Sequence, residues 1–185
     1  MHYLDNSATA PVLRESAERA FTVMTADFGN PSSQHKMGID AAHILKESRE
    51  TVAAALHAAP GEIIFTSCGT ESTNTALFGA ARRRRKGHII TTAIEHAATL
   101  SCCKRLEQEG FAFTYLAPDE TGHIPAAAFA AALRDDTILA SMMLVNNETG
   151  VQLPVEECGR MLKRRCPEAL FHIDAVQGLF RVPLT

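Results

Sequence analysis

The sequence predicts an α/β fold in which a mostly parallel sheet is covered by helices on both faces. From residue 62 onward, short apolar or β-branched runs alternate with longer stretches in which apolar residues recur at helical spacing. Strands that alternate with helices in this way are typical of parallel sheets. The predicted strands cover residues 63–65, 88–92, 111–116, 137–145 and 170–173, and the helices between them cover 71–85, 97–109, 125–133 and 155–164.

The first sixty residues predict two further helices. Residues 3–11 form a short extended start, and Pro11 suits the first turn of a helix over 12–28. The loop 29–33 is rich in turn residues and ends this helix. Apolar residues then return at helical spacing from 38 to 57, before Ala59-Pro60-Gly61 stops the run.

Composition narrows the class of protein. The 185 residues are 46% hydrophobic and 21% charged, which suits one ordinary globular domain. A net charge of -3 argues against nucleic acid as a partner. No apolar run approaches the ~18 residues of a membrane span, and the start lacks the pattern of a signal peptide. We therefore expect a cytoplasmic protein with no membrane partner.

Cysteines and basic residues add two smaller expectations. The five cysteines form no C-x-x-C pair or metal-ligand spacing, so we expect reduced, mostly buried thiols and no metal site. A nucleophilic role for Cys68 or Cys103 has no support in the sequence. The basic run 82–86 falls where a helix should end, and cations there complement the helix dipole. We interpret this run as a solvated helix end.

Residues 62–76, EIIFTSCGTESTNTA, predict a phosphate cup. The pattern is a buried strand, a small hydroxyl-rich turn with one glycine, and then a helix. A helix that begins at such a turn presents unpaired N–H groups and the positive end of its dipole to an anion. The alternative is an ordinary Ser/Thr helix cap with a glutamate partner.

Polar residues also follow three of the other predicted strands. They are Ile94-Glu95-His96, the Asn-rich turn 146–150 and the segment 172–177. Each alone is more often a helix cap or a turn. Because the carboxyl ends of parallel strands are where α/β sheets bind ligands, the set together predicts a functional site at this edge.

Six motifs in this order resemble the cysteine desulfurases (NifS/IscS-like) of the class V aminotransferase group, which depend on pyridoxal phosphate (PLP). They are YLDNSAT, FGNPSSQH, TSCGTESTN, EHAAT, NNETG and HIDAVQ, and they extend over essentially the whole chain. The resemblance implies the large domain of a fold type I PLP-dependent transferase, truncated here. It places an N-terminal arm at residues 1–15 and the N-terminal part of the PLP-binding large domain at 16–185.

The resemblance also implies roles for six residues. Gly69 and Thr70 match the pair that binds the cofactor phosphate, in agreement with the predicted cup. Asp174 is similar to the aspartate that pairs with the pyridine nitrogen, which makes the ring an electron sink. Gln177 matches the glutamine that hydrogen-bonds the phenolic oxygen.

His96 and Asn147 complete the implied site. His96 resembles the histidine that stacks on the ring and takes part in proton transfer, and it is the candidate catalytic residue. Asn147 is similar to the asparagine close to the ring oxygen and the substrate carboxylate.

The family's cofactor lysine, persulfide cysteine and substrate arginine have no match in these residues. Ser33-Gln34-His35-Lys36 spells the Ser-x-His-Lys of the cofactor lysine, but by position it matches an early loop, so we do not assign Lys36 that role. We expect a fragment that is inactive alone.

The resemblance implies that the full-length enzyme converts L-cysteine to L-alanine and transfers sulfur as an enzyme persulfide. Its expected partners are a second copy in a homodimer and a sulfur-acceptor or scaffold protein, as in iron-sulfur cluster assembly. Selenocysteine lyase or another class V enzyme is one alternative. A non-catalytic remnant that serves as a binding module is another.

Overall fold

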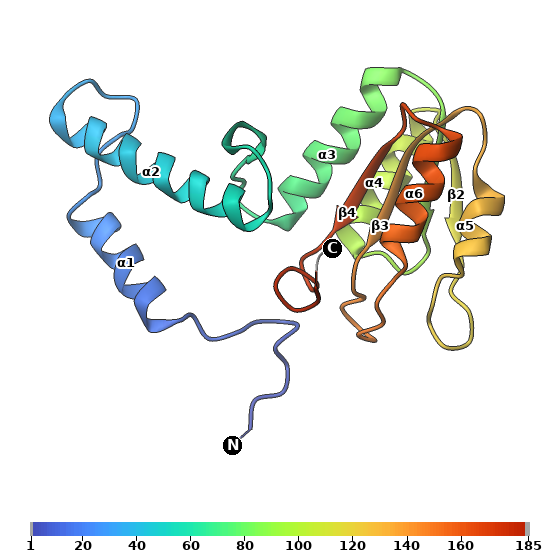
Figure 1. Ribbon diagram of the computed structural model, residues 1–185, viewed down its shortest axis with the longest axis horizontal. Coiled ribbons are helices and arrows are strands. Elements are labelled where there is room, and N and C mark those ends of the chain that lie inside the picture. The colour runs from blue at the N-terminus through green and yellow to red at the C-terminus, as the bar shows by residue number, and fades with distance from the viewer. Residues whose placement is uncertain (1, 184–185) are drawn as a thin grey trace. The chain divides into compact units, whose positions relative to one another are not determined.

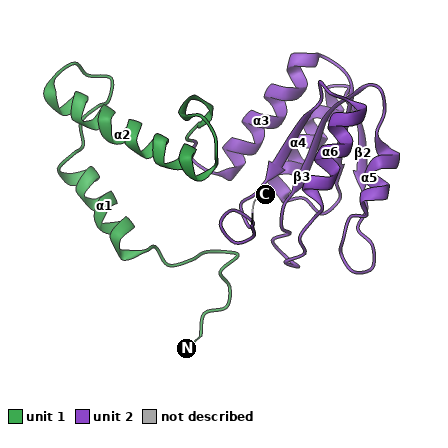
Figure 2. Cartoon of the chain, in the orientation of Figure 1, with its two compact units in different colours: residues 1–65 green, residues 66–185 purple. Residues whose placement is uncertain are grey.

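The computed structural model describes residues 2–183 and divides the chain into two compact units. Unit 1 is Met1–Phe65 and unit 2 is Thr66–Thr185 (Figure 2). Length alone suggests a single domain, whereas the contacts separate the first 65 residues from the rest. The boundary between an arm and a large domain near residue 15 stays a prediction.

Unit 1 contains the two predicted helices, α1 (Arg14–Thr25) and α2 (Lys36–Ala55), followed by a short 3-10 turn, η1 (Pro60–Glu62). The start of α2 is held by the loop before it. The ring nitrogen Nδ1 of His35 caps the helix by accepting from the Gly38 N–H at 3.4 Å. A Cβ on Gly29 would lie 2.0 Å from the Met37 carbonyl oxygen, so only glycine fits this approach of loop to helix.

The predicted strand 63–65 is wrong. These residues belong to no strand, and Ile64 and Phe65 are 75% and 47% exposed. A strand is stabilised by hydrogen bonds to a neighbour, and no described residue of unit 1 offers one. Instead, the Arg49 guanidinium donates to the Ile63 carbonyl and lies over the Phe65 ring at 4.9 Å.

Unit 2 confirms the predicted parallel sheet. Its strands are β1 (His88–Thr92), β2 (Ala112–Leu116), β3 (Thr137–Met143) and β4 (Leu170–Asp174), all parallel in the order β2-β1-β3-β4. The helices are α3 (Gly69–Arg84), α4 (Ala97–Gln108), α5 (Ala126–Ala132) and α6 (Val155–Arg165). Each predicted element from residue 71 onward lies within two residues of its observed bounds.

Helices cover both faces of the sheet, as predicted, and a separate core lies under each pair (Figure 1). Because successive residues of a strand point to opposite faces, Ile89 packs with α3 and α4 while Ile90 packs with α5 and α6. Leu77 and Leu106 fill the first core, and Phe129 and Leu162 fill the second.

The strand order places a topological switch point between β1 and β3. The chain runs from β1 to β2 on one side and then returns to form β3 on the other side of β1. The pairing of β1 with β3 ends at Ile90 and Ala140, although β1 pairs with β2 as far as Thr92. The carboxyl ends of β1 and β3 are therefore not paired with each other. Sheets of this class bind ligands at this position, beyond the carboxyl ends of the strands at the switch point.

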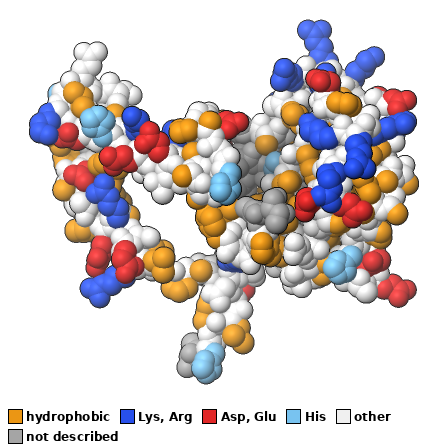
Figure 3. All heavy atoms as spheres, viewed as in Figure 1, with side chains coloured by type: hydrophobic (Ala, Val, Ile, Leu, Met, Phe, Trp, Pro, Cys, Tyr) orange, Lys and Arg blue, Asp and Glu red, His pale blue; other side chains and the backbone are white. Residues whose placement is uncertain are grey.

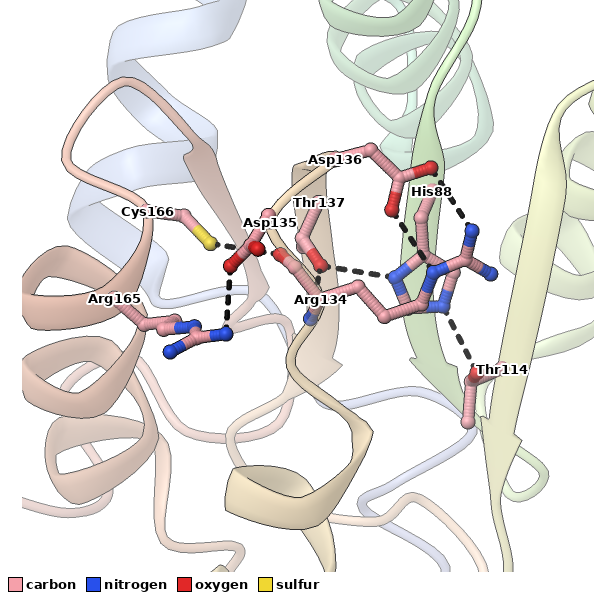
Figure 4. A network of polar contacts seen from close by, with 8 residues as sticks. All are labelled: His88, Thr114, Arg134, Asp135, Asp136, Thr137, Arg165 and Cys166. Carbon is pink, nitrogen blue, oxygen red and sulfur yellow. Dashed lines mark hydrogen bonds and ion pairs between the residues drawn. The ribbon is translucent and has the colours of Figure 1, made fainter.

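The amino ends of the same strands are held by a polar network (Figure 4). The fully buried His88 ring hydrogen-bonds with the Thr137 hydroxyl at 2.9 Å on β3 and with the Thr114 hydroxyl at 2.8 Å on β2. Arg134 forms a bidentate pair with Asp136 beside the ring. Burial is the main cause that lowers the pKa of His88, with the Arg134 cation adding to it and Asp136 opposing it.

We expect His88→Ala to destabilise the chain by about 2–4 kcal/mol, because it opens a cavity and removes the bridge that joins three strands. The histidine's contribution should be full above pH ~6.5 and lost as the pH falls, because a lowered folded-state pKa penalises protonation of the folded protein. Urea unfolding measures both effects. The exposed His123→Ala is the control, and equal stability of the two variants would contradict the bridge.

The basic run forms the end of α3, as predicted, and its arginines are used within unit 2. Arg82 pairs with Glu109 at 2.7 Å and stacks over the Phe78 ring at 4.3 Å, and Arg84 donates to the Glu168 carbonyl. Basic side chains gather at this end of the helix (Figure 3). Across residues 2–183, no helix is long and apolar enough to span a membrane.

Candidate functional site

The predicted cup is the first turn of α3. The helix begins at Gly69 after an extended Cys68, as expected for a turn of small residues. The Glu71 carboxylate accepts from the Ser67 N–H at 2.7 Å and from its hydroxyl at 2.5 Å. The N-cap residue of α3 is Cys68 and it makes no side-chain capping hydrogen bond, so the Ser/Thr cap that the sequence left open is not formed. The glutamate instead holds Ser67, the residue before the N-cap, and Gly69 and Thr70 lie in the first turn.

The cup lies beside residues from two strand ends. A Cβ on Gly69 would lie 3.7 Å from Val176 Cγ2, in the turn that follows β4. Thr70 and His96 both line a cleft of about 470 Å³ between α3 and α4. The structure thus brings the cup, the end of β1 and the end of β4 to one edge of the sheet.

His96 is the N-cap residue of α4 and is exposed. Its Nδ1 accepts from the Ala98 N–H at 3.2 Å. In the neutral ring this hydrogen bond puts the proton on Nε2. The backbone of α4 thereby orients the imidazole and selects its tautomer.

Asp174 is the last residue of β4 and is half-buried. Its Oδ1 accepts from the Val176 N–H at 3.1 Å, and its carbonyl accepts from the Leu144 N–H at 2.8 Å. Gln177 is half-buried in the following turn, where its side-chain oxygen accepts from the Arg181 guanidinium. Both predicted residues therefore lie at the carboxyl end of the sheet.

Asn147 lies in the turn after β3 and is half-buried, with its Nδ2 donating to Glu148 Oε1 at 2.8 Å. The residue before it, Asn146, organises the turn. Asn146 Oδ1 accepts from the N–H groups of Glu148 and Thr149 and from the Thr149 hydroxyl, at 2.9, 2.9 and 3.1 Å.

Glu95 and Asn146 lie in segments that the sequence predicted to form the site, but the sequence assigned neither of them a role. Glu95 is only 5% exposed, and burial raises its pKa to about 7 although hydrogen bonds from Thr92 and Met143 oppose the rise. A single glutamate in an apolar loop and a first asparagine of a pair are weak signals, because nothing in the sequence shows that either side chain is buried.

The cysteines divide into two environments. Four are buried, and burial raises the pKa of the Cys102, Cys103 and Cys158 thiols to about 11, 12 and 11. The expectation of mostly buried thiols is thus confirmed, and Cys68 is the exposed exception. The backbone N–H of Glu71 is the main cause that lowers its pKa. Cys68 is therefore the most reactive of the five thiols.

Lys36 lies in unit 1 at the first position of α2. Its ammonium pairs with Asp40 at 2.8 Å, and this hydrogen bond raises its pKa. A lysine that acts as a nucleophile needs a lowered pKa. The pKa of Lys36 is raised rather than lowered, so its environment does not suit a nucleophile. This supports leaving Lys36 out of the site.

Comparison with known proteins identifies the family. The family described as Aminotransferase class-V matches residues 2–185. The chain belongs to the aminotransferase class-V family. Cysteine desulfurase 2 of Trichormus variabilis is 46% identical to this class-V chain over 183 residues, which cover 98% of the chain and 46% of the relative.

Further relatives agree with this assignment to the family. Putative cysteine desulfurase IscS 1 of Bacillus subtilis is 45% identical over 98% of the chain and 48% of its own length. A solved NifS-like protein superposes with a TM-score of 0.95 at 40% identity, over 99% of the chain and 51% of the structure. The solved structure of SspA in complex with cysteine superposes with a TM-score of 0.88 at 37% identity. The match covers 94% of this chain and 50% of the SspA chain. The class-V chain spans about half the length of the curated relatives it matches.

Proposed function

We propose that the whole protein is a PLP-dependent cysteine desulfurase that converts L-cysteine to L-alanine. The observation that carries the proposal is the convergence of the α3 cup with the ends of β1 and β4 in a class-V chain whose relatives are desulfurases. In the overall reaction, the Cβ–S bond of L-cysteine breaks and an S–S bond forms to an enzyme thiol. Alanine takes up the proton that this thiol releases. We propose that this thiol lies outside these residues.

The residues at this edge fit the chemical groups of PLP. Its phosphate suits the first turn of α3 at Gly69 and Thr70, where N–H groups and the helix dipole favour an anion. Its ring nitrogen suits a carboxylate, which Asp174 supplies. Its phenolic oxygen suits amide donors, which Gln177 and Asn147 supply. When bound, PLP supplies an electron sink for a negative charge at Cα of the amino acid.

The chain's own residues would hold and move protons around that group. The Asp174 carboxylate stabilises a positive charge at the end of β4. The Nε2 atom of His96 carries the movable proton, because Nδ1 is engaged by the Ala98 N–H. The Glu71 carboxylate accepts from Ser67 and so holds the turn that leads into α3.

We also propose the substrate, the location in the cell and the protein partners. L-Cysteine as substrate is supported by the solved complex of SspA with cysteine. A cytoplasmic location is supported by five free cysteines in one chain, which suit a reducing compartment. By analogy with the family, we propose a homodimer and transfer of sulfur to an acceptor or scaffold protein, as in iron-sulfur cluster assembly.

The whole protein with PLP should release L-alanine from L-cysteine, measured by amino-acid analysis, with L-selenocysteine compared in parallel. Alkylation of Cys68 by iodoacetamide should slow when PLP or inorganic phosphate is added, because an anion in the first turn of α3 covers the neighbouring thiol. Alanine released only from selenocysteine would favour the lyase alternative. No alanine from either amino acid would contradict the proposal.

A further inference from the structure

Two buried side chains join the loops that carry His96 and Asn147. From the loop after β1, Glu95 Oε1 reaches across to accept from the Met143 N–H of β3 at 3.0 Å. From the turn after β3, Asn146 Nδ2 reaches back to donate to the Ile94 carbonyl at 2.9 Å. Each loop thus uses a side chain to bind the backbone of the other.

These contacts replace the sheet hydrogen bonds that the switch point lacks. Pairing of β1 with β3 ends at Ile90 and Ala140, so the Met143 N–H has no partner on β1. The Glu95 carboxyl fills this place, and the Thr92 hydroxyl donates to the same oxygen at 2.6 Å. The two strand ends are therefore held at a separation set by side chains rather than by the ladder.

Glu95 and Asn146 each directly precede a candidate site residue. Glu95 is followed by His96, and Asn146 by Asn147. Glu95 and Asn146 are each 5% exposed, so neither is a surface contact. We propose that Glu95 and Asn146 are positioning residues that fix, across the switch point, where His96 and Asn147 present their side chains. This inference rests on the proposed function.

The charge around Glu95 supports this role. Its second oxygen, Oε2, is buried and has no hydrogen-bond partner among the described residues. Burial is the main cause that favours the uncharged form of Glu95, the hydrogen bonds from Thr92 and Met143 oppose it, and the Asp174 carboxylate on β4 adds to it. The Cys103 thiol of α4 interacts electrostatically with the same carboxyl. Below pH 7, the protonated carboxyl joins β1 to β3 without adding a second negative charge beside Asp174.

The first test follows the contact itself in the 185-residue chain without cofactor. At pH 4.5, where the native carboxyl holds its proton, hydrogen exchange of the Met143 amide should be at least tenfold faster in Glu95→Ala than in the native chain. It should stay within about threefold of native in Glu95→Gln, which keeps an acceptor oxygen. Glu120→Gln, which changes an exposed glutamate in the loop after β2, is the control. Unchanged exchange in Glu95→Ala would overturn the proposal.

The second test follows the proposed consequence in the whole protein with PLP. Glu95→Ala and Asn146→Asp, which loses the donor to Ile94 but keeps the turn acceptors, should each lower kcat for alanine release at least tenfold. KM for L-cysteine should change less than threefold. Glu95→Gln should restore most of kcat. A Glu95→Gln variant as slow as Glu95→Ala, or a Glu95→Ala variant as fast as native, would overturn the positioning role. A native protein that releases no alanine would contradict the proposed function, while the exchange test would still decide whether Glu95 holds β3.

Discussion

Asp174→Ala should lower kcat for alanine release by the whole protein at least about 100-fold. Charge stabilisation in a protein site is typically worth a factor of this size or more. The half-buried carboxylate at the end of β4 lies next to the turn that touches the cup, and it is the candidate partner of a protonated ring nitrogen. Without it, a positive charge at this position loses its counter-ion. Steady-state kinetics with excess PLP measures the effect.

Two further variants separate charge from structure. Asp174→Asn keeps an oxygen that accepts from the Val176 N–H, so it should fold like the native protein and still lose most of the activity. Asp135→Ala removes an exposed carboxylate that pairs with Arg165 at the other end of the sheet, and it should leave kcat within twofold. A fully active Asp174→Asn variant would show that the charge is not needed.

Glu95→Gln should stabilise the 185-residue chain above pH 7 by about 3 kcal/mol, an order-of-magnitude value from the raised pKa. The ordinary pKa of 4.5 applies in the unfolded chain, and burial raises it to about 7 in the folded one. The folded state therefore holds the proton more tightly. The stability that comes from the protonated carboxyl is complete below pH 4.5 and is lost as the pH rises through 7.

Glutamine cannot ionise, and its side-chain oxygen can still accept from Thr92 and Met143. The difference in unfolding free energy between Glu95→Gln and the native chain should grow between pH 4.5 and 7 and then level off. Urea unfolding at half-unit pH steps gives this curve. The histidines with lowered pKa, His88 and His172, are present in both proteins, so the difference isolates Glu95. A difference that does not change with pH would mean that Glu95 stays charged when folded.

Local patterns predicted most of unit 2 because its inner strands are short runs buried on both faces and its helices bury one clear face. The run 88–92 is buried throughout, and the helix 97–108 places Cys102, Cys103 and Leu106 on one side. The predicted strand 63–65 has the same apolar character but lacks a paired neighbour among the described residues. Apolar residues favour burial, yet only a hydrogen-bonded partner makes them a strand.

The candidate site also has one part that the sequence predicted and one part that only the structure showed. Motifs suggested six site residues, and the structure places all of them in unit 2, in the first turn of a helix, at the end of a strand or in the segment after one: Gly69, Thr70, His96, Asn147, Asp174 and Gln177. Their roles stay predictions. The supporting role of Glu95 and Asn146 could not be predicted, because their hydrogen bonds join residues about 50 positions apart in the sequence.

The sequence by itself determined the alternation of strands and helices, the small-residue turn at the start of α3 and the family to which the motifs belong. These features depend on neighbouring residues, whose spacing decides which side chains share a face. Only the tertiary structure decided that β1 and β3 separate after Ile90 and that Glu95 spans the gap, that His88 joins three strands, and that Cys68 is exposed. Each of these features depends on which segments, far apart in the sequence, come into contact. The strand order β2-β1-β3-β4 determines those contacts.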